Sequence, residues 1–158
     1  MKYRKKRMND QGVLDIPFKI IIMIIMIGSV IPLGLMNYRN ISRENFKLKI
    51  ENELENLCFS AREISMLGNL SSKKVGLDLE GNIFADIDYV KIRNESGKDE
   101  EIIEYRFKWE KSPHYISHDD VSIYPKTDNT ITLHGGTHHL VLTHLKSPGK
   151  SAVLVSLN

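Results

Sequence analysis

The sequence predicts an α+β protein in which a long N-terminal transmembrane and amphipathic helix precedes a small antiparallel β-sheet head. Three patterns support this fold class. An apolar run without ionisable residues extends from Ile20 to Met36, apolar residues then recur at helical spacing as far as Leu67, and alternation typical of strands follows. We therefore expect a basic cytoplasmic leader at residues 1–10, a transmembrane helix at 11–37, an amphipathic extension of the helix at 38–68 and a β-rich extracytoplasmic head at 69–158.

The apolar run is long enough to cross a membrane. At about 1.5 Å per residue it nearly spans a hydrocarbon core of roughly 30 Å, and the residues from Ile16 to Phe18 lengthen it. A secretory signal peptide has a shorter apolar core, followed by small residues at a cleavage site, which Asn37–Asn40 do not provide. The sequence therefore predicts a helix that stays in the membrane.

Five basic residues in the segment from Lys2 to Arg7 set the orientation of this helix. By the positive-inside rule, they place the N-terminus in the cytoplasm and the C-terminal part of the chain on the other side. The net charge of +2 is concentrated in this leader, and the rest of the chain is mildly negative. Because no basic stripe with interleaved aromatic residues occurs elsewhere, we expect no nucleic-acid partner.

Asp10-Gln11-Gly12 joins the basic leader to the apolar helix, and this order resembles the class III signal peptide of archaeal type IV pilin-like proteins. In that family a prepilin peptidase removes the leader on the cytoplasmic side, and mature chains of the archaeal group start with Gln. The resemblance implies cleavage between Asp10 and Gln11, after which the hydrophobic helix packs with those of other subunits in a surface filament.

The resemblance also gives roles to two residues inside the helix. Asp15 corresponds to the carboxylate that neutralises the N-terminal amine of a neighbouring subunit in the filament core. A lone carboxylate at the start of a membrane helix is costly, so a partner is expected on physical grounds as well. Pro32 is of a kind seen in pilin helices, where it kinks the helix or loosens it locally.

Between Ser42 and Leu67, apolar residues at three- and four-residue spacing predict an amphipathic helix that packs against the head. Two arrangements are open: one continuous helix from about Ile16 to Leu67, or a separate helix capped by Ser42. Gly68-Asn69 is a stop signal for either. The predicted buried stripe consists of Phe46, Ile50, Leu54, Leu57, Cys58, Ala61 and Ile64, and it makes Cys58, the only cysteine, a buried thiol.

Alternating residues after the helix predict strands and two hairpins. Ile83–Val90 and Ile102–Trp109 flank a turn at residues 94–99, with Ile83, Ala85, Ile87 and Tyr89 on one face of the first strand. Residues 130–134 and 137–145 flank Gly135-Gly136, and glycine readily adopts the positive φ that a two-residue hairpin turn needs. A turn at Ser147–Lys150 leads to a last strand at 152–157. We expect one antiparallel sheet of five or six strands around the amphipathic helix.

Histidines near Gly135-Gly136 are the weak candidates for a metal site. In the predicted hairpin, His134 and His139 share the polar face and His138 belongs to the buried face. His144 completes the cluster. A third ligand would have to come from the preceding loop, from His114, His118, Asp119 or Asp120, so we expect ordinary solvated or interfacial histidines and no metal or other cofactor.

Nothing else in the sequence predicts an enzyme. Asp86 and Asp88 lie on one strand face, without the burial that makes one of two carboxylates a general acid. Aromatic residues Tyr105, Phe107 and Trp109 are expected in the core.

The sequence thus predicts a type IV pilin-like structural subunit of a cell-surface filament or of its assembly machinery. Its expected partners are the membrane, a prepilin peptidase and other pilin-like subunits. The first alternative is an uncleaved signal-anchored single-pass membrane protein with an extracytoplasmic β-rich binding domain. The second is a membrane-tethered metal-dependent hydrolase.

Overall fold

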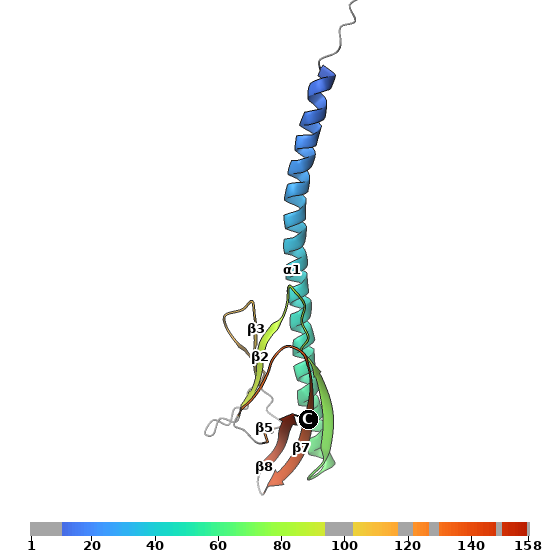
Figure 1. Ribbon diagram of the computed structural model, residues 1–158. Coiled ribbons are helices and arrows are strands. Elements are labelled where there is room, and N and C mark those ends of the chain that lie inside the picture. Colours follow the sequence, from blue (N-terminus) through green and yellow to red (C-terminus); the bar gives the residue numbers. More distant parts are fainter. Residues whose placement is uncertain (1–10, 94–102, 117–121, 127–129, 148–149, 158) are drawn as a thin grey trace, which may run out of the picture. The chain divides into compact units, whose positions relative to one another are not determined.

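A computed structural model describes residues 11–93, 103–116, 122–126, 130–147 and 150–157, with backbone alone for residues 11–16, 147, 150 and 151 (Figure 1). The chain divides into two compact units, Met1–Asn40 and Ile41–Asn158. Helix α1 (Gln11–Leu67) contributes to both. Its helical conformation continues through Asn37–Asn40, so the single continuous helix is the arrangement observed.

Ser42 therefore lies inside α1 and caps no second helix. Its hydroxyl accepts a hydrogen bond of 3.1 Å from the side-chain amide of Asn82. The predicted stop is confirmed, because α1 ends at Leu67 and Gly68 adopts a φ of 108°, in the left-handed region that glycine enters without strain.

The first of two sheets has the strand order β1-β7-β8-β5. Its strands β1 and β7 are antiparallel, as are β7 and β8, whereas β5 runs parallel to β8. The antiparallel pairing of β7 with β8 confirms the predicted last strand. The strands are β1 (Ser72–Asp78), β5 (Ser122–Pro125), β7 (Thr137–Ser147) and β8 (Lys150–Leu157).

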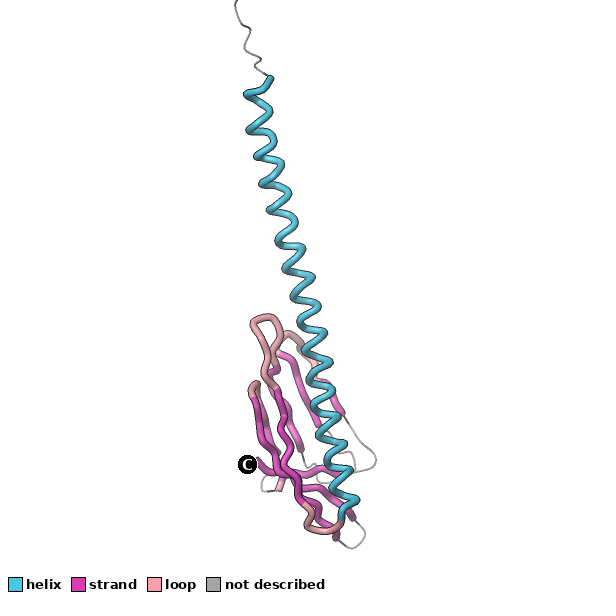
Figure 2. The backbone as a smooth tube through the Cα atoms, turned by 90° about the vertical axis from the view of Figure 1, so that its right-hand side faces the viewer, coloured by secondary structure: helices cyan, strands magenta, loops and turns pink. Residues whose placement is uncertain are grey.

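The second sheet is fully antiparallel, with the order β4-β3-β2-β6. Both sheets lie along the part of α1 that follows Ile41 (Figure 2). The α+β class is thus confirmed, but the described part of the head has two four-stranded sheets instead of one sheet of five or six strands. The strands of the second sheet are β2 (Ile87–Arg93), β3 (Ile103–Phe107), β4 (His114–Ile116) and β6 (Thr130–Leu133).

Strands β2 and β3 pair as predicted, and Ala85 and Ile87 of the predicted alternation are buried, but the alternation does not hold along the whole segment. The strand begins at Ile87, and Ile83 before it is 90% exposed. A register shift between Ile87 and Tyr89 inserts one residue, so that Val90 and Ile92 point into the core in place of Tyr89. The turn predicted at 94–99 lies outside the described residues.

The hairpin predicted at Gly135-Gly136 is wrong, because β6 pairs with β2 in one sheet and β7 pairs with β1 and β8 in the other. Only Gly136 of the two glycines has a positive φ, 127°, whereas a type I′ turn needs two such residues. A Cβ on Gly135 would lie 2.9 Å from Oδ1 of Asp86. The glycines thus allow the chain to pass closely over Asp86 as it changes sheets.

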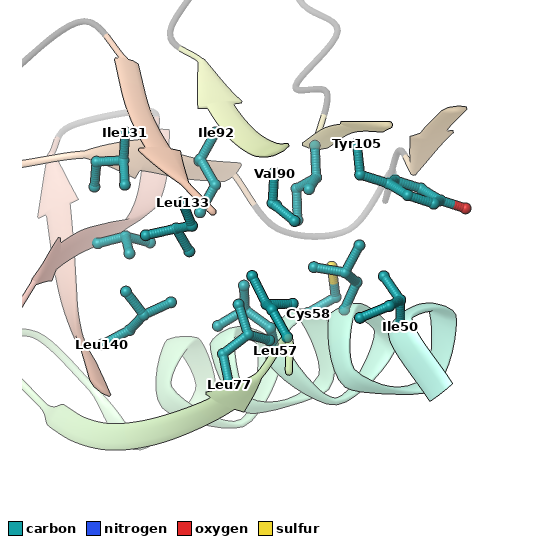
Figure 3. Packing of buried hydrophobic residues seen from close by; sticks show 14 of the residues in the cluster. Ile50, Leu57, Cys58, Leu77, Val90, Ile92, Tyr105, Ile131, Leu133 and Leu140 are labelled. Atoms are coloured by element: carbon teal, nitrogen blue, oxygen red, sulfur yellow. The ribbon is translucent and has the colours of Figure 1, made fainter. Parts of the chain in front are cut away.

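The core combines the buried stripe of α1 with the inner faces of both sheets. Figure 3 shows Ile50, Leu57 and Cys58 of the helix facing side chains from β1, β2, β3, β6 and β7. Every residue of the predicted stripe is buried. Burial raises the pKa of the Cys58 thiol to about 11, and the Glu55 carboxylate adds to the increase, so the predicted buried thiol is confirmed.

Two leucines on opposite sides of α1 provide a matched test of this packing. Leu54 is fully buried and Leu48 is largely exposed. We expect Leu54→Ala to lower the free energy of unfolding by about 2–5 kcal/mol, because it leaves a cavity between helix and sheets. Leu48→Ala should change it by less than about 0.5 kcal/mol. Denaturant unfolding of the full chain in detergent measures both, and similar losses would contradict the assigned core.

Candidate functional site

The strongest functional feature is the apolar segment of α1 before Asn40. From Pro17 onwards α1 is long and apolar enough to cross a membrane, and none of its most apolar 18-residue window is buried. Its isoleucine, methionine, leucine and valine side chains are exposed around the whole circumference. Such a surface is unfavourable in water and suits a lipid bilayer or contact with other apolar helices. The segment therefore fits membrane anchoring.

Ser29 and Pro32 bear on the hydrogen bonding of the backbone in this apolar segment. The Ser29 hydroxyl donates to the carbonyl of Ile25 at 2.9 Å or to that of Met26 at 3.0 Å, so it needs no water. Pro32 lies inside the helix and has no N–H to donate to the carbonyl of Gly28. Helical conformation nevertheless continues past Pro32.

The proposed processing site lies at the start of the described chain. Gln11 is the first residue of α1, whereas Asp10 and the rest of the leader lie outside the described residues. Asp15 lies in the helix and would be the fifth residue of the expected mature chain. Its side chain lies outside the described part.

The predicted metal candidates are not brought together as a site. His134 follows β6, and its Nδ1 donates to the carbonyl of Asp88 at 2.7 Å. His139 lies in β7 opposite Gly76 of β1, and it is exposed. His138 donates through Nε2 to the carbonyl of His134 at 2.7 Å. His134 thus lies beyond the end of β6, whereas His139 lies within β7, and β6 and β7 form no hairpin.

The other possible ligands do not complete a metal site in the described structure. His114 contacts the carboxylate of Glu110 and stacks on Tyr105 at 5.2 Å, while His118, Asp119 and Asp120 lie outside the described residues. Among the residues that are described, no group of three or more His, Cys, Asp or Glu side chains is placed to hold a metal.

The carboxylates of β2 and the loop before it are engaged in ion pairs with β3 and its C-terminal turn. Asp88 accepts from Nε of Arg106 at 2.9 Å, and Asp86 contacts Lys108. These hydrogen bonds raise the pKa of both the Arg106 guanidinium and the Lys108 ammonium. Such pairs join neighbouring strands at a partly exposed surface, where each contributes little to stability.

Glu104 is the most buried carboxylate among the described residues. It accepts from the Tyr89 hydroxyl and lies 2.8 Å from Arg93 of the adjacent strand. This hydrogen bond raises the pKa of the Tyr89 phenol. The Arg93 guanidinium thus balances the charge of Glu104 within the sheet.

Tyr105 and Phe107 of β3 are buried in the core, as predicted, and Trp109 just beyond the strand is half-buried against it. Phe107 stacks on Trp109 with ring centroids 4.7 Å apart and meets Phe46 of α1 edge-on at 6.0 Å. The guanidinium of Arg43 lies over the Trp109 ring at 5.3 Å. Tyr105 is buried, and burial raises its pKa above the ordinary value. These rings fix α1 to the second sheet.

His144 has a structural role that the sequence reading missed. It is almost fully buried in β7, and its Nδ1 donates to the carbonyl of Gly68, just beyond the end of α1, at 2.8 Å. Backbone hydrogen bonds join the same two segments. The Leu70 N–H donates to the His144 carbonyl, and the His144 N–H donates to the Ser71 carbonyl. Two-residue periodicity from Leu140 and Leu142 would have placed His144 on the buried face.

We expect His144→Leu to lower the free energy of unfolding by about 1–3 kcal/mol, because the Gly68 carbonyl loses its buried donor. His144→Asn keeps a side-chain N–H near the same position and should retain much of that stability. The exposed His139→Leu is the matched control and should change the stability by less than about 0.5 kcal/mol. Thermal or denaturant unfolding of the full chain measures all three, and equal losses for His144→Leu and His139→Leu would refute the assignment.

Comparisons with known proteins assign this arrangement to no group: no protein-family model, no curated protein and no solved structure matches the chain.

Proposed function

We propose that the chain is a type IV pilin-like structural subunit of a cell-surface filament or of its assembly machinery. The observation that carries this proposal is the exposed apolar segment of α1, which directly follows a short basic leader and continues into the helix that forms the core of the head. A subunit of this kind is inserted in the membrane first and is then incorporated into a filament through its apolar helix. The head remains on the extracytoplasmic side.

The apolar side chains surround the helix completely, so they suit a lipid bilayer and can also contact several neighbouring helices at once. In this proposal Asp15 pairs with the N-terminal amine of a neighbouring subunit, and Pro32 lets the helix adapt locally when it leaves the membrane.

Removal of the leader is the first test of the proposal. The full chain is produced in membranes with an archaeal prepilin peptidase, or with an inactive form of that enzyme as the control. We expect intact-mass and N-terminal peptide analysis to find a mature chain starting at Gln11 only with the active peptidase. A chain that keeps Lys2–Asp10 in both samples, and in its native membranes, would instead support the signal-anchored ectodomain.

Assembly is tested separately through Asp15. Asp15→Asn should leave cleavage unchanged and lower the recovery of the protein in sheared, sedimentable filaments by at least about tenfold, because the amine of each neighbour then loses its counter-charge in an apolar environment. Asp15→Glu retains the carboxylate and should assemble more readily. Equal filament recovery from Asp15→Asn and the unchanged chain would remove the ion pair from the proposal.

A further inference from the structure

The turn between β1 and β2 exposes a bulky apolar side chain. Ile83 is 90% exposed, the largest exposed fraction of any large apolar side chain in the described part of the chain. Asn82 and Ala85 form an isolated antiparallel bridge, so Ile83 and Phe84 occupy the two central positions of a tight turn. We call residues 82–85 the Ile83 turn. Glycine, proline and small polar residues are usual at such positions, so two bulky apolar residues there require a reason.

Hydrogen bonds within the protein satisfy much of the backbone of the Ile83 turn. The side-chain oxygen of Asn82 accepts from the N–H groups of Phe84 at 2.9 Å and Ala85 at 3.0 Å. The Asn82 N–H donates to the Ala85 carbonyl at 2.7 Å. The Phe84 carbonyl accepts from Nε of Arg43 in α1 at 3.3 Å. These polar groups need no water, which lowers the cost of moving the turn into a less polar medium.

The Ile83 turn is bound to the beginning of the head-bearing part of α1. The side-chain amide of Asn82 donates to the Ser42 hydroxyl at 3.1 Å. Ser42 follows Met36, the last residue of the apolar run, by six residues, all of them helical. Six helical residues rise about 9 Å, and the headgroup layer of a bilayer is about 5–8 Å thick. With Met36 at the edge of the hydrocarbon core, Ser42 therefore lies close to the outer surface of the headgroups.

Tyr38 supports the same level for the membrane surface. Tyrosine is enriched at membrane–water interfaces, and Tyr38 is 60% exposed just after the apolar run. It precedes Ser42 by four residues, so the two residues lie one helical turn apart on the same side of α1. The Ile83 turn is bound to this side of the helix.

We propose that the Ile83 turn contacts the surface of the phospholipid bilayer that anchors the chain, with the Ile83 side chain among the lipid headgroups. The bilayer is always within reach, because the six residues from Met36 to Ser42 span about 21 Å even when fully extended. Such a tether gives the contact a high effective concentration. One isoleucine offers far less area than the roughly 800 Å² per partner with which proteins form stable complexes, so a free protein is a poorer occupant.

A polarity-sensitive fluorescent probe at position 83 tests the contact in the full chain. Ile83→Cys is labelled with NBD and reconstituted in phosphatidylcholine vesicles, with the unchanged chain as a measure of labelling at the buried Cys58. We expect lipids that carry a nitroxide on the headgroup to quench this probe at least about threefold more strongly than the same probe at Met66→Cys. Met66 is 71% exposed and lies 24 residues, about 36 Å, beyond Ser42 along α1.

Leu48→Cys is the matched control at a shorter distance. Leu48 is 53% exposed and lies six residues, about 9 Å, beyond Ser42. Quenching should therefore decrease in the order 83, 48 and 66. Equal quenching at positions 83 and 66 would overturn the inference. A low-polarity signal at position 83 that disappears when the chain is diluted in lipid would assign the turn to a contact between copies and would overturn it too.

The native Trp109, the only tryptophan, separates contact from mere proximity. Its ring lies beneath the guanidinium of Arg43, which also donates to the Phe84 carbonyl. Headgroup nitroxides should quench Trp109, and Ile83→Asn should lower this quenching at least about twofold, because the apolar contact is lost. Ile83→Leu should retain it, as should Met66→Asn, the same kind of change far from the turn. Equal quenching of Trp109 in Ile83→Asn and the unchanged chain, both with protease-resistant heads, would reject the contact.

The results separate this inference from the proposed function, because the Ile83 turn and Ser42 are the same with and without the leader. A chain that is processed at Gln11 and forms filaments, but whose Trp109 quenching in vesicles ignores Ile83→Asn, would overturn the lipid contact and leave the pilin-like function intact. An unprocessed chain whose quenching depends on Ile83 would support the contact and favour the signal-anchored ectodomain.

Discussion

The structure of the head depends on the burial of one apolar stripe of α1. Phe46, Ile50 and Leu54 lie on it, together with the residues one to three turns further on, and both sheets pack their inner faces against it. Neither sheet has a second layer of its own among the described residues, so each needs the helix to cover its apolar face. The Phe46, Phe107 and Trp109 rings and the Arg43 guanidinium extend the same contact towards the N-terminal end of the stripe.

Hydrogen bonds between α1 and the head hold both ends of the buried stripe in place. At its C-terminal end, His144 and the backbone of Leu70 and Ser71 bind the chain just after α1 to β7, where the helix leaves carbonyl groups without helical donors. At its N-terminal end, Asn82 binds Ser42, and Lys49 donates to the Glu80 carbonyl at 3.1 Å and lies 2.8 Å from Asp78. The helix is therefore held at both ends of the stripe as well as along it.

The head-bearing part of α1 thus has two sides of different character. The inner side is apolar and is buried by the head. The outer side mixes exposed apolar and charged residues. Substitutions on the outer side therefore leave the core contacts in place.

The sequence by itself determined the features that depend on local periodicity. The apolar run, the buried stripe from Phe46 to Ile64, the end of α1 at Gly68 and the β-rich nature of the head follow from residue spacing, because every turn of a helix or pleat of a strand repeats the same geometry. The processing site and Asp15 remain predictions.

Tertiary structure alone decided which strands pair. Gly135-Gly136 is compatible with a hairpin turn, yet β6 joins β2 while β7 joins β1 and β8, so the chain crosses between the sheets close to Asp86. Only the packed helix end places a carbonyl against His144. Such contacts join residues far apart in sequence, and no local pattern encodes them.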